Sequence, residues 1–175
     1  MRKNIKFWQV AGFVFIGIAG ALLHFLYEWS GESFLIAPFS AVNESIFEHI
    51  KLLFFPWLTF AFIEKKCIGR NIPNFWCAKL VGIVTGIILI PAIFYTYTGA
   101  LGVTADWFNI AIFFIVVAVS LYIETIIIKS GKCSLPNAIS LFIIILLGVV
   151  LVALTFFPFH IPLFEDPITN LYGII

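Results

Sequence analysis

Five long apolar runs limit what this chain can fold into. They cover about residues 7–27, 44–63, 75–97, 105–128 and 136–159. Each is close to the ~20 residues that a helix needs to cross ~30 Å of hydrocarbon. A helix satisfies its backbone polar groups internally, so it is the usual form in which such a run crosses lipid. The sequence therefore predicts an all-α bundle of five transmembrane helices, forming a single domain over residues 1–175.

The composition agrees with a membrane location. Hydrophobic residues make up 62% of the 175 positions and charged residues 11%, which is unusual for a soluble globular domain. Membrane lipids are the expected partners, and nucleic acid is not. The run at residues 7–29 is longer than the ~7–15 residues of a signal-peptide core, so we interpret it as a first helix. Residues 33–42 are apolar but too short to cross, and we expect them to be interfacial or re-entrant.

The charged residues predict the orientation. With five spans, nine of the ten basic residues fall on one side: Arg2, Lys3, Lys6, Lys65, Lys66, Arg70, Lys79, Lys129 and Lys132. The positive-inside rule makes that side cytoplasmic, which leaves the C-terminus outside. We therefore expect a multi-pass protein of a cell membrane, the inner membrane of a bacterium. Cys67, Cys77 and Cys133 fall on the cytoplasmic side, where we expect free, reduced thiols.

Polar residues interrupt the start of the second run, in "FSAVNESIFEHIK" at 39–51. On a helix with ~100° per residue, Glu44, Glu48 and Lys51 share a ~60° arc, and His49 lies beside it. The first run ends with His24 and Glu28 on one face. Below them Gly17 and Gly20 would let another helix approach closely.

We expect the two polar faces to meet just beneath the outer surface. That contact would join His24, Glu28, Glu44, Glu48 and His49, with His160, Glu165 and Asp166 emerging at the same surface. Charged groups at the centre of a membrane cost ~2.5–3.5 kcal/mol each on insertion scales, so these groups need partners or water. A purely structural alternative is a Glu48–Lys51 ion pair with His24 and Glu28 as an interfacial cap. Glu124 is expected to be a charge at the cytoplasmic edge, near Lys129.

Two kinds of chemistry fit these residues. The catalytic candidates are His24, Glu28, Glu48, His49 and Lys51, with a histidine as general base, a carboxylic acid as general acid and the lysine as electrostatic stabiliser. The metal-ligand candidates are His24, Glu28, Glu44, Glu48 and His49, a set that suits zinc or iron. A metal-bound hydroxide would perform hydrolysis. We favour an intramembrane acid-base or metal-dependent enzyme acting on a lipid-like substrate.

Other functions remain open. A transporter, channel or binding subunit for a cation is suggested by the outer surface, which carries one lysine against seven acids. The inner halves of the spans, however, show almost no polar residues to continue a pathway. His24 and His49 could instead be axial ligands of a haem. A homo-oligomer or a complex with a partner membrane subunit is compatible with each of these functions.

Two motifs carry a family resemblance. "HFLYEWSG" at 24–31 and "FSAVNESIFEHIKLLFFPW" at 39–57 resemble an uncharacterised family of small bacterial polytopic membrane proteins. The resemblance is concentrated in the first third of the chain and implies no activity. A fainter similarity is to the sterol isomerase and sigma-2 receptor membrane domain, in which a His-x-x-x-Glu pair acts on a sterol-like substrate. His24 and Glu28 match that pair, but "NESIFEH" lacks the tyrosine and aspartate of that family's second motif.

Overall fold

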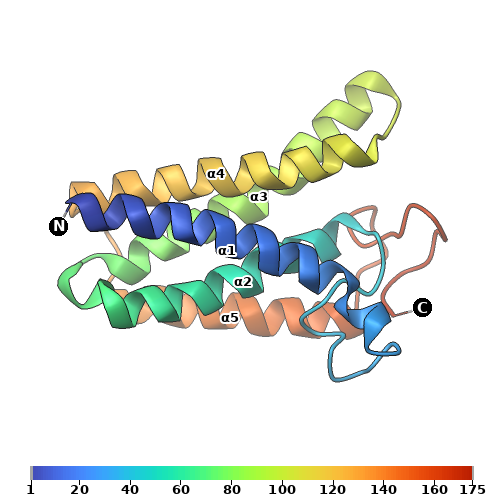
Figure 1. Ribbon diagram of the computed structural model, residues 1–175. Coiled ribbons are helices and arrows are strands. Elements are labelled where there is room, and N and C mark those ends of the chain that lie inside the picture. Colours follow the sequence, from blue (N-terminus) through green and yellow to red (C-terminus); the bar gives the residue numbers. More distant parts are fainter. Residues whose placement is uncertain (1, 175) are drawn as a thin grey trace.

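The computed structural model describes residues 2–174 and contains five long helices. They are α1 (Arg2–Trp29), α2 (Ile46–Cys67), α3 (Phe75–Leu101), α4 (Asp106–Ser130) and α5 (Asn137–Phe156), with a short 3₁₀ helix, η1 (Gly69–Asn71), between α2 and α3. Each of the five is long and apolar enough to cross a membrane. The helices lie side by side along one direction, and the far end of the α3–α4 hairpin leans away from the others (Figure 1). The predicted all-α, five-span fold is confirmed.

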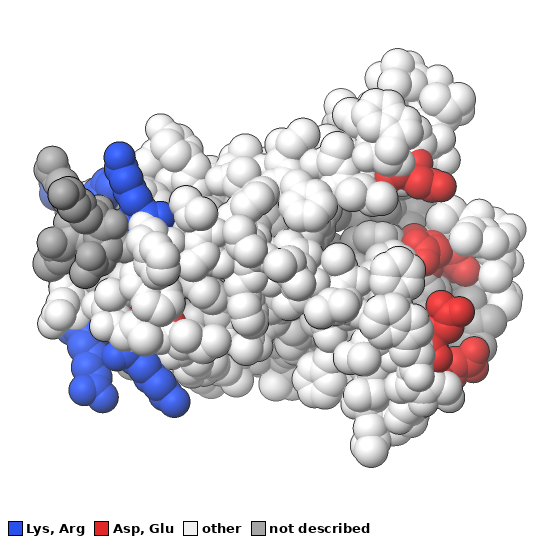
Figure 2. Space-filling view, viewed as in Figure 1, with Lys and Arg blue, Asp and Glu red and all other residues white. Residues whose placement is uncertain are grey.

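Charges separate along the bundle. Lysine and arginine side chains gather at the end that holds the N-terminus, and aspartate and glutamate side chains gather at the opposite end (Figure 2). We call these the basic end and the acidic end. The positive-inside rule continues to predict that the basic end faces the cytoplasm.

The segment at residues 33–42 forms turns at the acidic end and does not cross the bundle. Its anchor is Ser40, a fully buried residue. The Ser40 hydroxyl accepts a hydrogen bond from the backbone N–H of Tyr27 at 2.9 Å and donates one to the carbonyl of Leu23. The segment is therefore fixed to the last turns of α1.

Small residues bring α1 close to its neighbours, as the sequence predicts. A Cβ atom at Gly20 would lie 2.8 Å from the carbonyl oxygen of Leu52, and one at Gly17 would lie 2.7 Å from the ring of Phe114. Proline at position 56 has no N–H to bond the Leu52 carbonyl. Gly20 thus packs against the point on α2 where Pro56 interrupts the helical hydrogen bonds.

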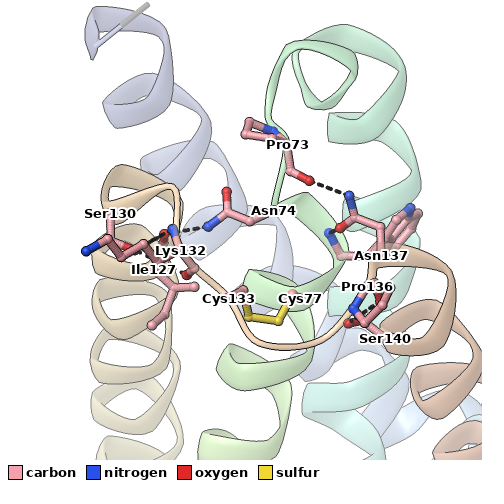
Figure 3. Close-up of a disulfide and its surroundings, with 11 residues drawn as sticks. Pro73, Asn74, Cys77, Ile127, Ser130, Lys132, Cys133, Pro136, Asn137 and Ser140 are labelled. Carbon is pink, nitrogen blue, oxygen red and sulfur yellow. Dashed lines mark hydrogen bonds between the residues drawn. A yellow bond between two sulfur atoms is a disulfide. The ribbon is translucent and has the colours of Figure 1, made fainter.

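A disulfide joins Cys77, in the first turn of α3, to Cys133, in the α4–α5 connection (Figure 3). The Cα atoms are 6.2 Å apart, within the usual range for a disulfide. The prediction of three free thiols was wrong, because cysteines 56 residues apart become neighbours only once the helices have packed. Cys67 is free and exposed. Beside the disulfide, the Asn74 side chain donates to the Ile127 carbonyl at 2.6 Å.

Candidate metal centre

His24, Glu44 and His49 come together at the acidic end of α1 and α2. The Nε2 atom of His24 is 3.5 Å from Oε2 of Glu44, and Nε2 of His49 is 3.9 Å from the same oxygen. One ligand atom from each side chain lies within 4.8 Å of the other two. The two imidazole rings meet edge to face with centroids 5.4 Å apart, which leaves no space for a porphyrin between them. This arrangement of the rings therefore does not fit a haem held by both histidines.

The loop before α2 positions Glu44. The Asn43 side chain accepts a hydrogen bond from the Ser45 N–H at 2.9 Å and donates one to the Gly173 carbonyl at 2.8 Å. Ser45 caps α2, since its hydroxyl accepts from the Glu48 N–H. The helix therefore begins at Ile46, two residues later than predicted, and Glu44 lies in the loop where its carboxylate can reach α1.

A backbone hydrogen bond fixes the protonation pattern of His49. Its Nδ1 is 2.9 Å from the Ser45 carbonyl oxygen, which can only accept, so Nδ1 carries the hydrogen. In the neutral imidazole this leaves a lone pair on Nε2, the atom that faces Glu44. Metal-binding histidines usually donate their second N–H to a carbonyl or carboxylate in this way.

The spacing and exposure of the three side chains suit a metal ion. Ligand atoms ~2.0–2.1 Å from a tetrahedral zinc lie ~3.3 Å from one another. The distances from Glu44 to His24 and His49, 3.5 and 3.9 Å, are somewhat longer, so small side-chain movements would bring the three groups onto one ion. The side chains of His24, Glu44 and His49 are 25%, 43% and 27% exposed. Since each is partly exposed, a fourth position remains accessible to water or a substrate.

The electrostatics favour an ionised carboxylate at the centre of this group. Interaction with the His24 imidazole lowers the pKa of Glu44 below its ordinary value, against the opposing effect of partial burial. The positive charge of a protonated His49 acts in the same direction. Glu44 is thus a negatively charged metal-ligand candidate near neutral pH.

Glu48 and Lys51 form a separate, buried pair. The Lys51 ammonium lies 2.7 Å from Oε2 of Glu48 and donates at 2.9 Å to both the Ala37 carbonyl and the Thr155 hydroxyl. The same Glu48 oxygen accepts from the Val42 N–H. All three ammonium hydrogens therefore have partners. This geometry ties α2 to the 33–42 segment and to α5. The ion pair is the one that the structural alternative describes, whereas His24 contacts Glu44 and not Glu28.

The remaining candidates lie apart from the three metal-ligand candidates. Glu28 is exposed in the last turns of α1. His160 packs against the ring of Tyr172, with centroids 4.8 Å apart, and Glu165 accepts a hydrogen bond from the Tyr172 hydroxyl. Asp166 bonds within its own turn, to the Thr169 hydroxyl. The expected convergence of five ionisable groups is therefore reduced to three.

An apolar groove leads along α1 toward the metal-ligand candidates. Its upper part, of about 460 Å³, lies between α1 and α2 and is lined by Phe15, Ala19, Leu22, Leu23, Phe39, Phe55, Pro56 and Thr59. A second part, of about 600 Å³, shares three of these residues and continues along α1 toward the basic end, as far as Phe7. Leu23, at one end of the groove, directly precedes His24.

A second buried charged group corrects two sequence-based expectations. Glu124 is fully buried and pairs with Lys79 at 2.7 Å, not with Lys129, and Lys79 also bonds Glu64. α2 continues to Cys67, beyond its predicted end at residue 63, and therefore includes Glu64. Lys79, which the sequence analysis grouped with the charges of the cytoplasmic side, lies in the second turn of α3, which begins at Phe75 as predicted. The inner half of the bundle is therefore not free of polar groups.

Comparison with known proteins identifies the family. The sequence model of one protein family, DUF6512, matches residues 1–174. This family is described as a family of unknown function. No curated protein and no solved structure shows a significant match to the chain. The match is consistent with the resemblance to an uncharacterised family that the sequence suggested. Because it covers nearly the whole chain, this protein belongs to the DUF6512 family of unknown function.

Proposed function

We propose that this protein is a membrane metalloenzyme that hydrolyses a lipid-like ester at the acidic end of the bundle. His24, Glu44 and His49 would hold one divalent transition-metal ion, zinc or iron. The observation that carries the proposal is the fixed orientation of His49, whose Nδ1–H donates to Ser45 and whose Nε2 lone pair faces the Glu44 carboxylate. Two imidazoles and one carboxylate are a common ligand set of catalytic zinc and of non-haem iron.

The open side of the site supports hydrolysis. A metal ion with three protein ligands keeps a position for water and lowers the pKa of that water to about 7. Such a metal would supply the hydroxide for hydrolysis of an ester. One ester and one water molecule would give a carboxylate, an alcohol and one proton released to solvent, and no other reactant would be required.

The groove along α1 supports a substrate with an acyl chain. Phe7 and Leu23 are sixteen residues apart, so the groove extends for ~24 Å along the helix axis, comparable to most of the hydrocarbon thickness. Its walls are almost entirely apolar. A chain lying there would gain ~25 cal/mol per Å² of surface removed from water and would leave its ester near His24.

The test is ester hydrolysis by the detergent-purified protein. Nitrophenyl esters of long-chain and short-chain fatty acids are compared with zinc added and with a chelator added. The proposal expects zinc-dependent hydrolysis that is at least tenfold faster for the long chain, and loss of activity in Glu44→Gln. Glu28→Gln, the same change at an exposed site at the same end, is the control and should keep full activity. Zinc binding without hydrolysis of any ester would contradict the enzymatic function.

A cation transporter is the second candidate. The buried charges Glu64, Lys79 and Glu124 favour it, because they supply polar groups in the half of the bundle where the sequence suggested none. The centre of the bundle opposes it. Leu53, Phe54 and Ile83 are fully buried there, and their apolar side chains separate the two charged regions. Uptake of radioactive zinc into proteoliposomes, with Glu44→Gln as comparison, would distinguish transport from hydrolysis.

A further inference from the structure

The Glu64–Lys79–Glu124 cluster lies near the basic end, away from the proposed metal site. Its three charged side chains come from α2, α3 and α4, and each is at most 1% exposed. Lys79 donates to Oε2 of Glu64 and, at 2.7 Å, to Oε1 of Glu124. Glycine at position 82 makes room for this arrangement, since a Cβ there would lie 3.3 Å from Oε2 of Glu124.

The two carboxyl groups have different surroundings. Glu124 accepts three hydrogen bonds from side chains: one from Lys79, one from Gln9 at 2.9 Å and one from Trp57 at 3.1 Å. Its two oxygens are both satisfied, as a buried carboxylate requires. Glu64 has one bonded oxygen, while its Oε1 is buried without a hydrogen-bond partner. The surroundings of Glu124 therefore stabilise an ionised carboxylate, and those of Glu64 do so less well.

The charges of the cluster do not balance. With both acids ionised, two negative charges would face one positive charge in the low-dielectric interior of a membrane protein, where an uncompensated charge is costly. Among the residues whose side chains the structure describes, the groups that face the cluster from the other elements supply no second cation. α1 contributes the neutral Gln9, and the ammonium of Lys65 on α2 is engaged with the Gly69 carbonyl. One additional proton makes the cluster neutral.

We propose that the Glu64–Lys79–Glu124 cluster is a proton-binding site, with the proton held on Glu64. Its ligand is a proton exchanged with water at the basic end, because Glu64 lies within one turn of the end of α2. Two carboxyl groups around one lysine hold one proton at neutral pH. The Glu48–Lys51 pair, with one acid and one base, holds none.

Infrared spectroscopy of the purified protein at pH 7 tests the proton count. A protonated carboxyl group gives a C=O stretching band that an ionised carboxylate lacks, and exposed glutamates, with a pKa of about 4.3, are ionised at this pH. We expect one such group in the native protein and none in Glu64→Gln or Glu124→Gln, because each substitution balances the charges. Lys79→Met should raise the count to two. Glu28→Gln should leave it at one.

The position of the band tests the assignment to Glu64. Glu64→Asp should shift the band, because the vibrating group is then an aspartic acid, whereas Glu124→Asp should leave a glutamic acid band. Circular dichroism and size-exclusion chromatography establish which variants are folded. The native spectrum tests the number of protonated carboxyl groups even if a variant fails to fold. The absence of a protonated carboxyl group from the native protein, or its persistence in both glutamine variants, would overturn the proposal.

Discussion

Ser40 and Tyr27 lie thirteen residues apart, and the buried Ser40 hydroxyl accepts a hydrogen bond from the Tyr27 N–H at 2.9 Å. This contact, together with the bond that Ser40 donates to the Leu23 carbonyl, holds the 33–42 segment against the part of α1 that carries His24. The position of one proposed metal ligand therefore depends on a serine that binds no ligand itself.

The first prediction concerns this serine. Ser40→Ala removes both hydrogen bonds and should lower the free energy of unfolding by about 1–3 kcal/mol, the cost of leaving a buried polar group unsatisfied. Zinc affinity should fall as well, because the 33–42 segment loosens beside His24. Thermal unfolding and zinc titration measure the two effects. Ser134→Ala, outside the helices at the basic end, is the control. Unchanged stability and affinity in Ser40→Ala would contradict the anchoring role.

The second prediction concerns the Glu48–Lys51 pair. Lys51→Met leaves the Glu48 carboxylate buried without its counter-ion and should destabilise the protein by about 3–5 kcal/mol. The double variant Glu48→Gln/Lys51→Met removes both charges and should recover much of that loss. Thermal unfolding of the native protein and the variants forms the double-mutant cycle. A single variant as stable as the native protein would show that the pair does not tie α2 to the 33–42 segment and α5.

The third prediction concerns pH. Metal binding requires neutral imidazoles, and an ordinary imidazole has a pKa of about 6.5, so zinc affinity should fall as the pH drops below about 6.5. The pKa of Glu44 is lowered, so its carboxylate stays ionised through this range. In the metal-free protein, a lowered folded-state pKa means that Glu44 stabilises the fold fully above its ordinary pKa. That stability is lost as the pH falls below it.

Zinc titrations between pH 5 and 8 measure this dependence. Affinity that is constant across that range would argue against histidine ligands. Thermal unfolding of the metal-free protein, compared between the native chain and Glu44→Gln, should show a difference that shrinks as the medium becomes acidic.

The fourth prediction concerns the disulfide. Cys77→Ser should lower the free energy of unfolding by about 2–4 kcal/mol, because Cys77–Cys133 closes a long loop between α3 and the α4–α5 connection. Cys67→Ser should have no effect, since Cys67 is free and exposed. Thiol labelling of the denatured, unreduced protein should detect one reactive cysteine, and labelling after reduction should detect three. Three reactive thiols before reduction would contradict the pairing.

Much of the fold follows from the sequence, because five apolar runs of this length have few alternatives in a bilayer. The acidic and basic ends follow from the same pattern, since charges avoid the spans. Hydropathy could not find the Glu64–Lys79–Glu124 cluster, because each residue stands alone at the edge of a span. Their proximity appears only when α2, α3 and α4 pack together.

The site was harder to predict than the fold. The sequence identified His24, Glu44 and His49 but also included Glu28 and Glu48 in the same group. The pattern Ser45-x-x-Glu48 is typical of a helix start and would have placed Glu44 in the loop and Glu48 inside the helix. The sequence suggested the Glu48–Lys51 ion pair only as an alternative. It could not reveal that Ala37 and Thr155, from distant segments, accept the other hydrogen bonds of Lys51.

The most direct test of the metal site is the zinc content of the detergent-purified protein after loading and dialysis, measured by mass spectrometry. The account predicts about one zinc ion per chain in the native protein and in Glu28→Gln. It predicts less than about a tenth of that in His24→Gln, Glu44→Gln and His49→Gln, provided that circular dichroism shows all of them to be folded. Equal zinc content in the native protein and the three ligand variants would contradict the account.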